Sequence, residues 1–177
     1  MAIALGGYCH KAFIRVPEKT PTNFYGHRGA LGVMQANHDD PFKEGCILLS
    51  GVVIESTGSN LETAYLQVRG DLRGFKDHAA PIPRALQLAP LDFDEVLAHA
   101  YDTVVKNWEG IDAIAAGLLH LGRADGVVPR KRVCRIVDHY RSRAWVGRDT
   151  WRPAPSRNRV DMLLDVIRQR DPAHLQA

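Results

Sequence analysis

The chain has 177 residues, of which 45% are hydrophobic and 24% are charged, and this composition is typical of a globular protein with one ordinary domain. Its three cysteines are widely spaced and form no Cys-x-x-Cys pair, which argues against a disulfide framework and a zinc ribbon and favours a reducing compartment. No stretch approaches the roughly 20 apolar residues that span a bilayer, and the N-terminus lacks a signal-peptide pattern. We therefore expect a cytoplasmic protein that does not use a membrane.

The charge is distributed unevenly along the chain. From Gly126 to the C-terminus there are 12 Lys and Arg against 5 Asp and Glu, a balance of +7, so residues 1–125 carry −4 of the net +3. The basic part of the protein is therefore its C-terminal third.

The first predicted elements are two short strands. Lys11–Pro17 alternates apolar and other residues, and Gly29–Ala36 is a plausible second strand. Together they predict a small N-terminal β-hairpin with a long loop.

Two helices are predicted next. Asp40 followed by Pro41 is a favourable helix start, and the run that follows is apolar on nearly all sides. Periodicity alone fits a buried helix or a buried strand, and the length of the run and its stop at Gly58 favour the helix. Ser59 and Glu62 have the spacing of a capping box, which predicts a second helix that ends near Gly74.

The next predicted helix is the longest. Residues 76–90 contain three prolines and read as irregular, and Asp92 and Glu95 then form a second capping-box pattern. An apolar stripe runs from Phe93 to Leu118, about seven turns, with a break or kink expected near Gly110.

The C-terminal third is predicted to contain two shorter helices. Pro129 is expected to open one, and Val160–Ile167 marks the apolar face of the last. The predicted architecture is mainly α with a small N-terminal β-hairpin. We divide it into a helical domain over 1–140, a basic linker over 141–156, and a C-terminal amphipathic helix and tail over 157–177.

Few residues in the chain match a known catalytic pattern. There is no His-x-x-x-His pair, no phosphate-binding loop of the G-x-x-x-x-G-K-[ST] type and no G-x-S-x-G motif. Glu55 and Glu62 flank the turn at residues 56–60 and could share a site, although a helix end and a capping position already explain them. His99 lies on the long helix and could be a ligand, a proton carrier or a surface residue.

The basic C-terminal third allows a second interpretation. Trp145 and Trp151 are interleaved with arginines, a composition that suits phosphate contact and base stacking as well as a solvated arginine-rich segment. The candidate nucleic-acid contacts are Arg141, Arg143, Arg148 and Arg152.

Several segments, in order, resemble the peptidase domain of FtsH-type ATP-dependent zinc proteases. "HKAFIRVP" and "GALGVMQANHDD" resemble its strand pair, "ILLSGVVIES" resembles its "LLGGRAAEE" helix, and "TGSNLETAYLQV" resembles "TGASNDLERATQLA". "VVKNWEGIDAIAAGLLHLGRADGVV" resembles a late helix of that domain. The resemblance implies a largely helical, FtsH-peptidase-like domain that self-associates.

The departures from that family concern its metal site. The family's His-Glu-x-x-His helix precedes the strand pair, and this chain begins where that helix would end. The family's third zinc ligand is an aspartate, and Asn60 stands at or next to its position; a neutral amide is a poor zinc ligand. The resemblance thus implies a degenerate domain without metal or other cofactor, which acts by binding or assembly, with a protein partner or a second copy.

Two alternatives stay open. In the first, the protein is an active zinc metalloendopeptidase whose His-Glu-x-x-His helix lies upstream of Met1, with Glu55 or Glu62 as the third ligand. In the second, it is a nucleic-acid-binding protein that uses the basic C-terminal third.

Overall fold

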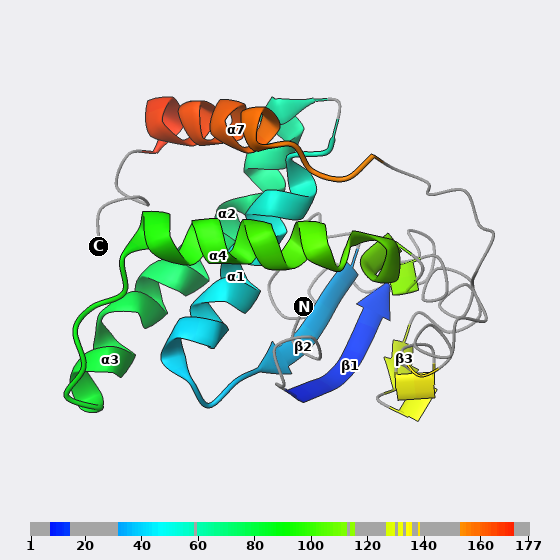
Figure 1. The fold of residues 1–177 in the computed structure, drawn as a ribbon, viewed down its shortest axis with the longest axis horizontal. Helices are drawn as coiled ribbons and strands as arrows, with labels where there is room; N and C mark the ends of the chain where they lie inside the picture. Colours follow the sequence, from blue (N-terminus) through cyan, green and yellow to red (C-terminus); the bar gives the residue numbers. More distant parts are fainter. Residues whose placement is uncertain are drawn as a thin grey trace.

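A computed structural model describes the backbone of residues 8–14, 32–58, 60–112, 114–115, 127–129, 131–132, 134–135, 138 and 153–171. It describes the side chains of these ranges from His38 onward, except those of 127–129. This part of the chain is mainly helical, as predicted (Figure 1). Its helices are α1 Pro41–Glu55, α2 Leu61–Ala79, α3 Pro81–Ala85, α4 Phe93–Lys106 and α7 Arg157–Arg170. Its strands are β1 Tyr8–Ile14, β2 Gly32–Asn37 and β3 Val127–Pro129. None of the described helices is both long and apolar enough to cross a bilayer.

Helix α1 begins as predicted and is the central helix of the core. The Asp40 carboxylate accepts hydrogen bonds from the backbone N–H groups of Phe42 and Lys43, at 2.9 and 3.4 Å, and Pro41 occupies the first turn. The helix packs against α2 and α4, and α7 also touches it (Figure 1). These neighbours explain why the run is apolar on nearly all sides, since several of its faces are buried.

Helix α2 starts and ends differently from the prediction. Its N-cap is Asn60 and not Ser59, so the predicted capping box is wrong. The helix continues beyond Gly74 to Ala79 because Phe75 and Ala79 extend its buried stripe. Gly74 is tolerated inside the helix because it lies close to Leu48, where a Cβ atom would come within 3.3 Å of that side chain.

The segment between α2 and α4 is more regular than predicted. Residues 76–79 belong to α2, and the prolines at 81 and 83 lie within the short helix α3. The backbone N–H of Leu91 donates to the carbonyl of Ala79 at 2.8 Å, and Gln87 has a positive φ of 60°. The prediction of an irregular segment over 76–90 therefore holds only from Leu86 to Pro90.

Helix α4 confirms its predicted start, and its break lies within one turn of the predicted one. The Asp92 side chain accepts a hydrogen bond from the N–H of Glu95 at 2.8 Å. The helix ends at Lys106, and helical residues resume at Trp108, so the interruption is at Asn107, three residues before Gly110. Asn107 ends the helix because its side-chain amide donates to the carbonyl of Thr103 at 2.7 Å.

The three strands form an antiparallel sheet in the order β2-β1-β3. Tyr8 pairs with Asn37 at one end of the β1–β2 ladder, and Lys11 pairs with Pro129 across β1 and β3. The prediction that Pro129 opens a helix is wrong: it closes the edge strand β3, where a missing N–H costs little, and helical residues follow from Lys131. The loop of the expected hairpin, residues 15–31, lies outside the described residues.

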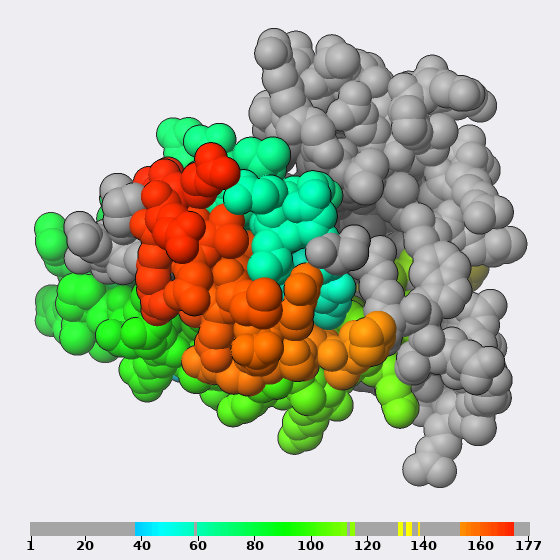
Figure 2. All heavy atoms as spheres, turned by 90° about the horizontal axis from the view of Figure 1, so that it is seen from above, coloured from blue at the N-terminus to red at the C-terminus, as the bar shows by residue number. Residues whose placement is uncertain are grey.

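The C-terminal helix α7 lies across α2, with α4 along its other side (Figure 2). Its apolar face is the predicted one, and those side chains are buried in the same core as those of α1, α2 and α4. They are Val160, Leu163, Leu164 and Ile167. The Tyr101 hydroxyl on α4 donates to the carbonyl of Pro155 at 3.3 Å, and Arg157 lies over the Tyr101 ring.

Candidate functional site

The turn between α1 and α2 is the place where the sequence suggested a former metal site. Near the end of α1, the hydroxyls of Ser56 and Thr57 each donate to a carbonyl three residues earlier, both at 2.7 Å. The N–H of Gly58 donates to the carbonyl of Glu55 at 3.0 Å. The turn thus satisfies free carbonyls of the helix end with its own donors.

Asn60 uses its side chain to cap α2. Its amide oxygen accepts hydrogen bonds from the N–H groups of Glu62 and Thr63, at 2.9 and 3.2 Å, and its backbone is extended, as an N-cap requires. The amide oxygen of the residue that the sequence suggested as a former ligand position is therefore engaged by the helix start.

Two arginines from α7 reach this turn. Arg159 donates from Nε to the carbonyl of Ser56 at 3.2 Å, and from Nη2 to the carbonyl of Gly58. Arg170 donates from Nη2 to Oε1 of Glu62 at 3.1 Å, in an exposed ion pair. The turn is therefore held by guanidinium groups that belong to a helix about one hundred residues later in the chain.

The two predicted carboxylates have different neighbours. Glu62 pairs with Arg170, as described above. Glu55, in the last turn of α1, acts electrostatically on Asp71 of α2. The sequence analysis did not identify Asp71 as a candidate. Its position could have been noticed, because Asp71 shares the helical spacing of Ala64, Val68 and Phe75 on the buried face of α2.

The Asp71 carboxyl group lies against α1 at Gly51. A Cβ atom at Gly51 would stand only 2.0 Å from Oδ2 of Asp71, so this glycine makes room for the carboxyl group. Burial raises the pKa of Asp71 from 3.8 to about 6, and the negative charge of Glu55 adds to the rise. Perturbed carboxyl groups of this kind are more common at functional sites than elsewhere, although structural networks also produce them.

Two histidines have structural contacts at the N-terminal end of α1. His78 of α2 donates from Nε2 to the carbonyl of Pro41 at 2.8 Å. The exposed His99 of α4 packs edge-on against Phe42, with ring centroids 5.4 Å apart. The His78 ring thus links α2 to α1 through a hydrogen bond, and the His99 ring packs against α1.

The described residues do not fit a zinc ion at the α1–α2 turn. Nowhere in the described ranges does a group of three His, Cys, Asp or Glu side chains have the arrangement of a metal site. At the turn itself the nearby groups are a capping amide, backbone carbonyls and the cationic side chain of Arg159, and zinc prefers thiolate, imidazole and carboxylate ligands. The predicted nucleic-acid contacts Arg141, Arg143, Arg148 and Arg152 lie outside the described residues.

Comparison with known proteins gives no match to a family model, to a curated protein or to a solved structure.

Proposed function

We propose that this protein is a non-catalytic binding or assembly module, with a scaffold similar to the peptidase domain of FtsH-type zinc proteases and an N-terminal β-hairpin. It acts in the cytoplasm on a protein partner or a second copy of itself. The observation that carries the proposal is the contact of Arg159 with the carbonyl oxygens of Ser56 and Gly58.

The physical argument concerns charge. A catalytic zinc ion is bound by three protein ligands, and its charge repels a second cation at the same turn. Arg159 donates hydrogen bonds to the turn that precedes Asn60. The side chain of Asn60 is neutral, so it cannot balance the positive charge of a metal ion. A guanidinium group thus supplies the positive charge at this turn, and it stabilises the turn without any capacity for hydrolysis.

The exposed surface of α3 and the following turn is consistent with a binding role. Three large apolar side chains, those of Ile82, Leu86 and Leu88, are 44–55% exposed within a few residues of one another. Clustered exposure of this kind is more typical of a contact surface than scattered single residues are.

The proposal is tested by metal analysis and a proteolysis assay on the full chain. Protein expressed and purified with zinc in every buffer is analysed by elemental mass spectrometry and incubated with casein. We expect far less than one zinc per chain and no casein cleavage. Stoichiometric zinc together with cleavage that a chelator abolishes would overturn the proposal.

The alternative, an active metallopeptidase, requires metal ligands that can be tested separately. It needs a His-Glu-x-x-His helix encoded upstream of Met1, which supplies two histidine ligands. It also needs a carboxylate at the turn as the third ligand. Glu62 would have to leave Arg170 to become that ligand, so the substitution Arg170→Gln should raise zinc affinity if the alternative holds. On our proposal the same substitution leaves zinc binding absent.

A further inference from the structure

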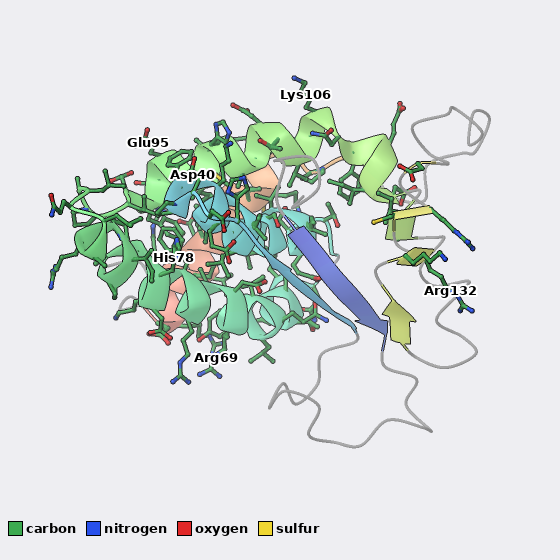
Figure 3. The ribbon with its side chains drawn as sticks, turned by 90° about the horizontal axis from the view of Figure 1, so that it is seen from below. Asp40, Arg69, His78, Glu95, Lys106 and Arg132 are labelled. Carbon is green, nitrogen blue, oxygen red and sulfur yellow. The ribbon has the colours of Figure 1, made fainter. Side chains whose placement is uncertain are left out.

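Three cationic side chains lie together on one short helical stretch after β3. Lys131, Arg132 and Arg135 are helical and exposed. Residues three and four apart on a helix are neighbours, so Arg135 lies beside both of the others. Figure 3 shows Arg132 at the opposite end of the molecule from Glu95, and its side chain extends away from the helices of the core. We call Lys131, Arg132 and Arg135 the basic turn.

The arginines of α7 have partners inside the protein. Arg157 pairs with Asp161, Arg168 with Asp165, and Arg170 with Glu62, while Arg159 binds the α1–α2 turn. Their charges are therefore largely engaged by the fold. They make a poor surface for a second, external anion.

Among the described residues, the basic turn has no such partners. Within the described part of the chain, no hydrogen bond or ion pair joins Lys131, Arg132 or Arg135 to an acceptor. Asp138 lies three residues beyond Arg135 and offsets part of the charge of that arginine, which leaves Lys131 and Arg132 without a described acid at helix spacing. Three like charges at neighbouring helix positions repel one another. A ligand with several negative charges at close spacing would relieve that repulsion.

The chemistry of the basic turn suits phosphate groups in series. Arginine binds phosphate through two parallel N–H donors, and lysine adds a compact positive charge. An amphipathic helix that inserts into a lipid surface uses exposed apolar residues beside its cations, and the described apolar neighbour here, Cys134, is half-buried. A nucleic-acid backbone offers regular phosphates and needs no apolar contact.

We propose that the basic turn binds the phosphate backbone of duplex nucleic acid without reading its sequence. This surface is separate from the α1–α2 turn, so the inference goes beyond the proposed function and does not depend on it. The partner is recognised through its phosphates, because three clustered cations match closely spaced negative charges and phosphate contacts carry no sequence information.

The test uses the full chain and a fluorescent 20-base-pair DNA duplex, with binding followed by anisotropy over about 50 to 200 mM salt. The variant Lys131→Gln/Arg132→Gln/Arg135→Gln removes the basic turn. The matched control Arg73→Gln/Arg84→Gln/Arg168→Gln removes three exposed cations elsewhere and changes the net charge equally. A third variant, Arg132→Lys/Arg135→Lys, keeps the charge. Circular dichroism confirms that each variant is folded.

We expect the wild-type affinity to fall steeply with salt. Loss of the basic turn should reduce the slope of log K against log salt by about 0.9 per lost contact and weaken binding at least about tenfold at 0.1 M salt. The control triple variant and the lysine variant should keep the wild-type slope to within about one contact.

Three results would overturn the inference. The first is no binding to duplex DNA at low salt. The second is an equal loss in the basic-turn and control variants, which would show that net charge alone is responsible. The third is binding to phosphatidylserine vesicles or polyglutamate in preference to DNA, which would identify a different class of partner. None of these results bears on zinc content or casein cleavage.

Discussion

At the residue scale, Arg159 links the end of the chain to the turn between α1 and α2. Nothing in the local sequence predicts this contact, because its two ends are 101 and 103 residues apart. The capping role of Asn60 could have been predicted, since asparagine is among the best N-cap residues and precedes a helical pattern directly. The capping-box spacing from Ser59 to Glu62 competes with this signal and misplaces the N-cap by one residue.

Replacement of Arg159 should destabilise the protein. Arg159→Met keeps much of the aliphatic stem and removes the hydrogen bonds to the carbonyls of Ser56 and Gly58, which should lower the free energy of unfolding by about 2–4 kcal/mol. Urea denaturation measures this loss. The matched control is Arg168→Met, which breaks an exposed ion pair with Asp165 and should cost about 0.5 kcal/mol or less. If both variants lose the same free energy of unfolding, Arg159 does not stabilise the turn more than an exposed arginine does.

Asp71 should make stability depend on pH. Its pKa is about 6 in the folded protein and 3.8 as a free side chain, so between these values the native state holds a proton that the unfolded state releases. The free energy of unfolding therefore falls as pH rises from about 4 to about 7, by about 2 kcal/mol from this group. Asp71→Asn should remove that decline and stabilise the protein at pH 8 more than at pH 4.5.

Urea denaturation of the wild type and of Asp71→Asn at these two pH values measures the difference. A loss of stability in the variant at pH 8 would mean that the ionised carboxylate has a favourable partner, contrary to the environment described here.

At the element scale, the sequence predicts helices well where local chemistry decides. The starts of α1 and α4 follow from Asp40 and Asp92, which cap their own helices. The errors occur where tertiary packing decides. Helix α2 outlasts Gly74 because Phe75 and Ala79 are buried, and Pro129 joins a strand because β1 lies beside it.

The close contact of α1 with α2 gives a paired prediction for two glycines. Gly51→Ala places a methyl group against the Asp71 carboxyl group and should destabilise the protein by about 1–3 kcal/mol. Gly70→Ala, at an exposed position of α2, should stabilise the protein by about 0.5–1 kcal/mol through its helix propensity. Thermal unfolding of both variants checks the signs, and a neutral Gly51→Ala would contradict the packing.

Helix α7 should contribute to the common core. Leu163 is fully buried and Met162, next to it, is 42% exposed. Leu163→Ala should lower the free energy of unfolding by about 2–5 kcal/mol, because it leaves a cavity among α1, α2 and α7. Met162→Ala should cost less than about 1 kcal/mol. If the two variants unfold at the same urea concentration, α7 is not packed as described.

At the scale of the whole molecule, the mainly helical architecture was predictable because apolar stripes of helical period dominate the chain. The arrangement of the site was not, since it depends on which helix ends meet. The sequence identified Asn60 and Glu62 as the residues of interest, and the fold adds Arg159, Arg170 and Asp71 around them.

The central claim is that arginine from α7, and not a metal ion, stabilises the α1–α2 turn. Thermal unfolding of the full chain with excess zinc, without metal and with a chelator tests it most directly. We predict melting temperatures that agree to within about 1 °C in all three conditions. A ligand present at about 100 times its dissociation constant stabilises a protein by about 2.7 kcal/mol, or about 5–10 °C for a chain of this size. A saturable rise of that order with zinc, reversed by the chelator, would contradict the claim.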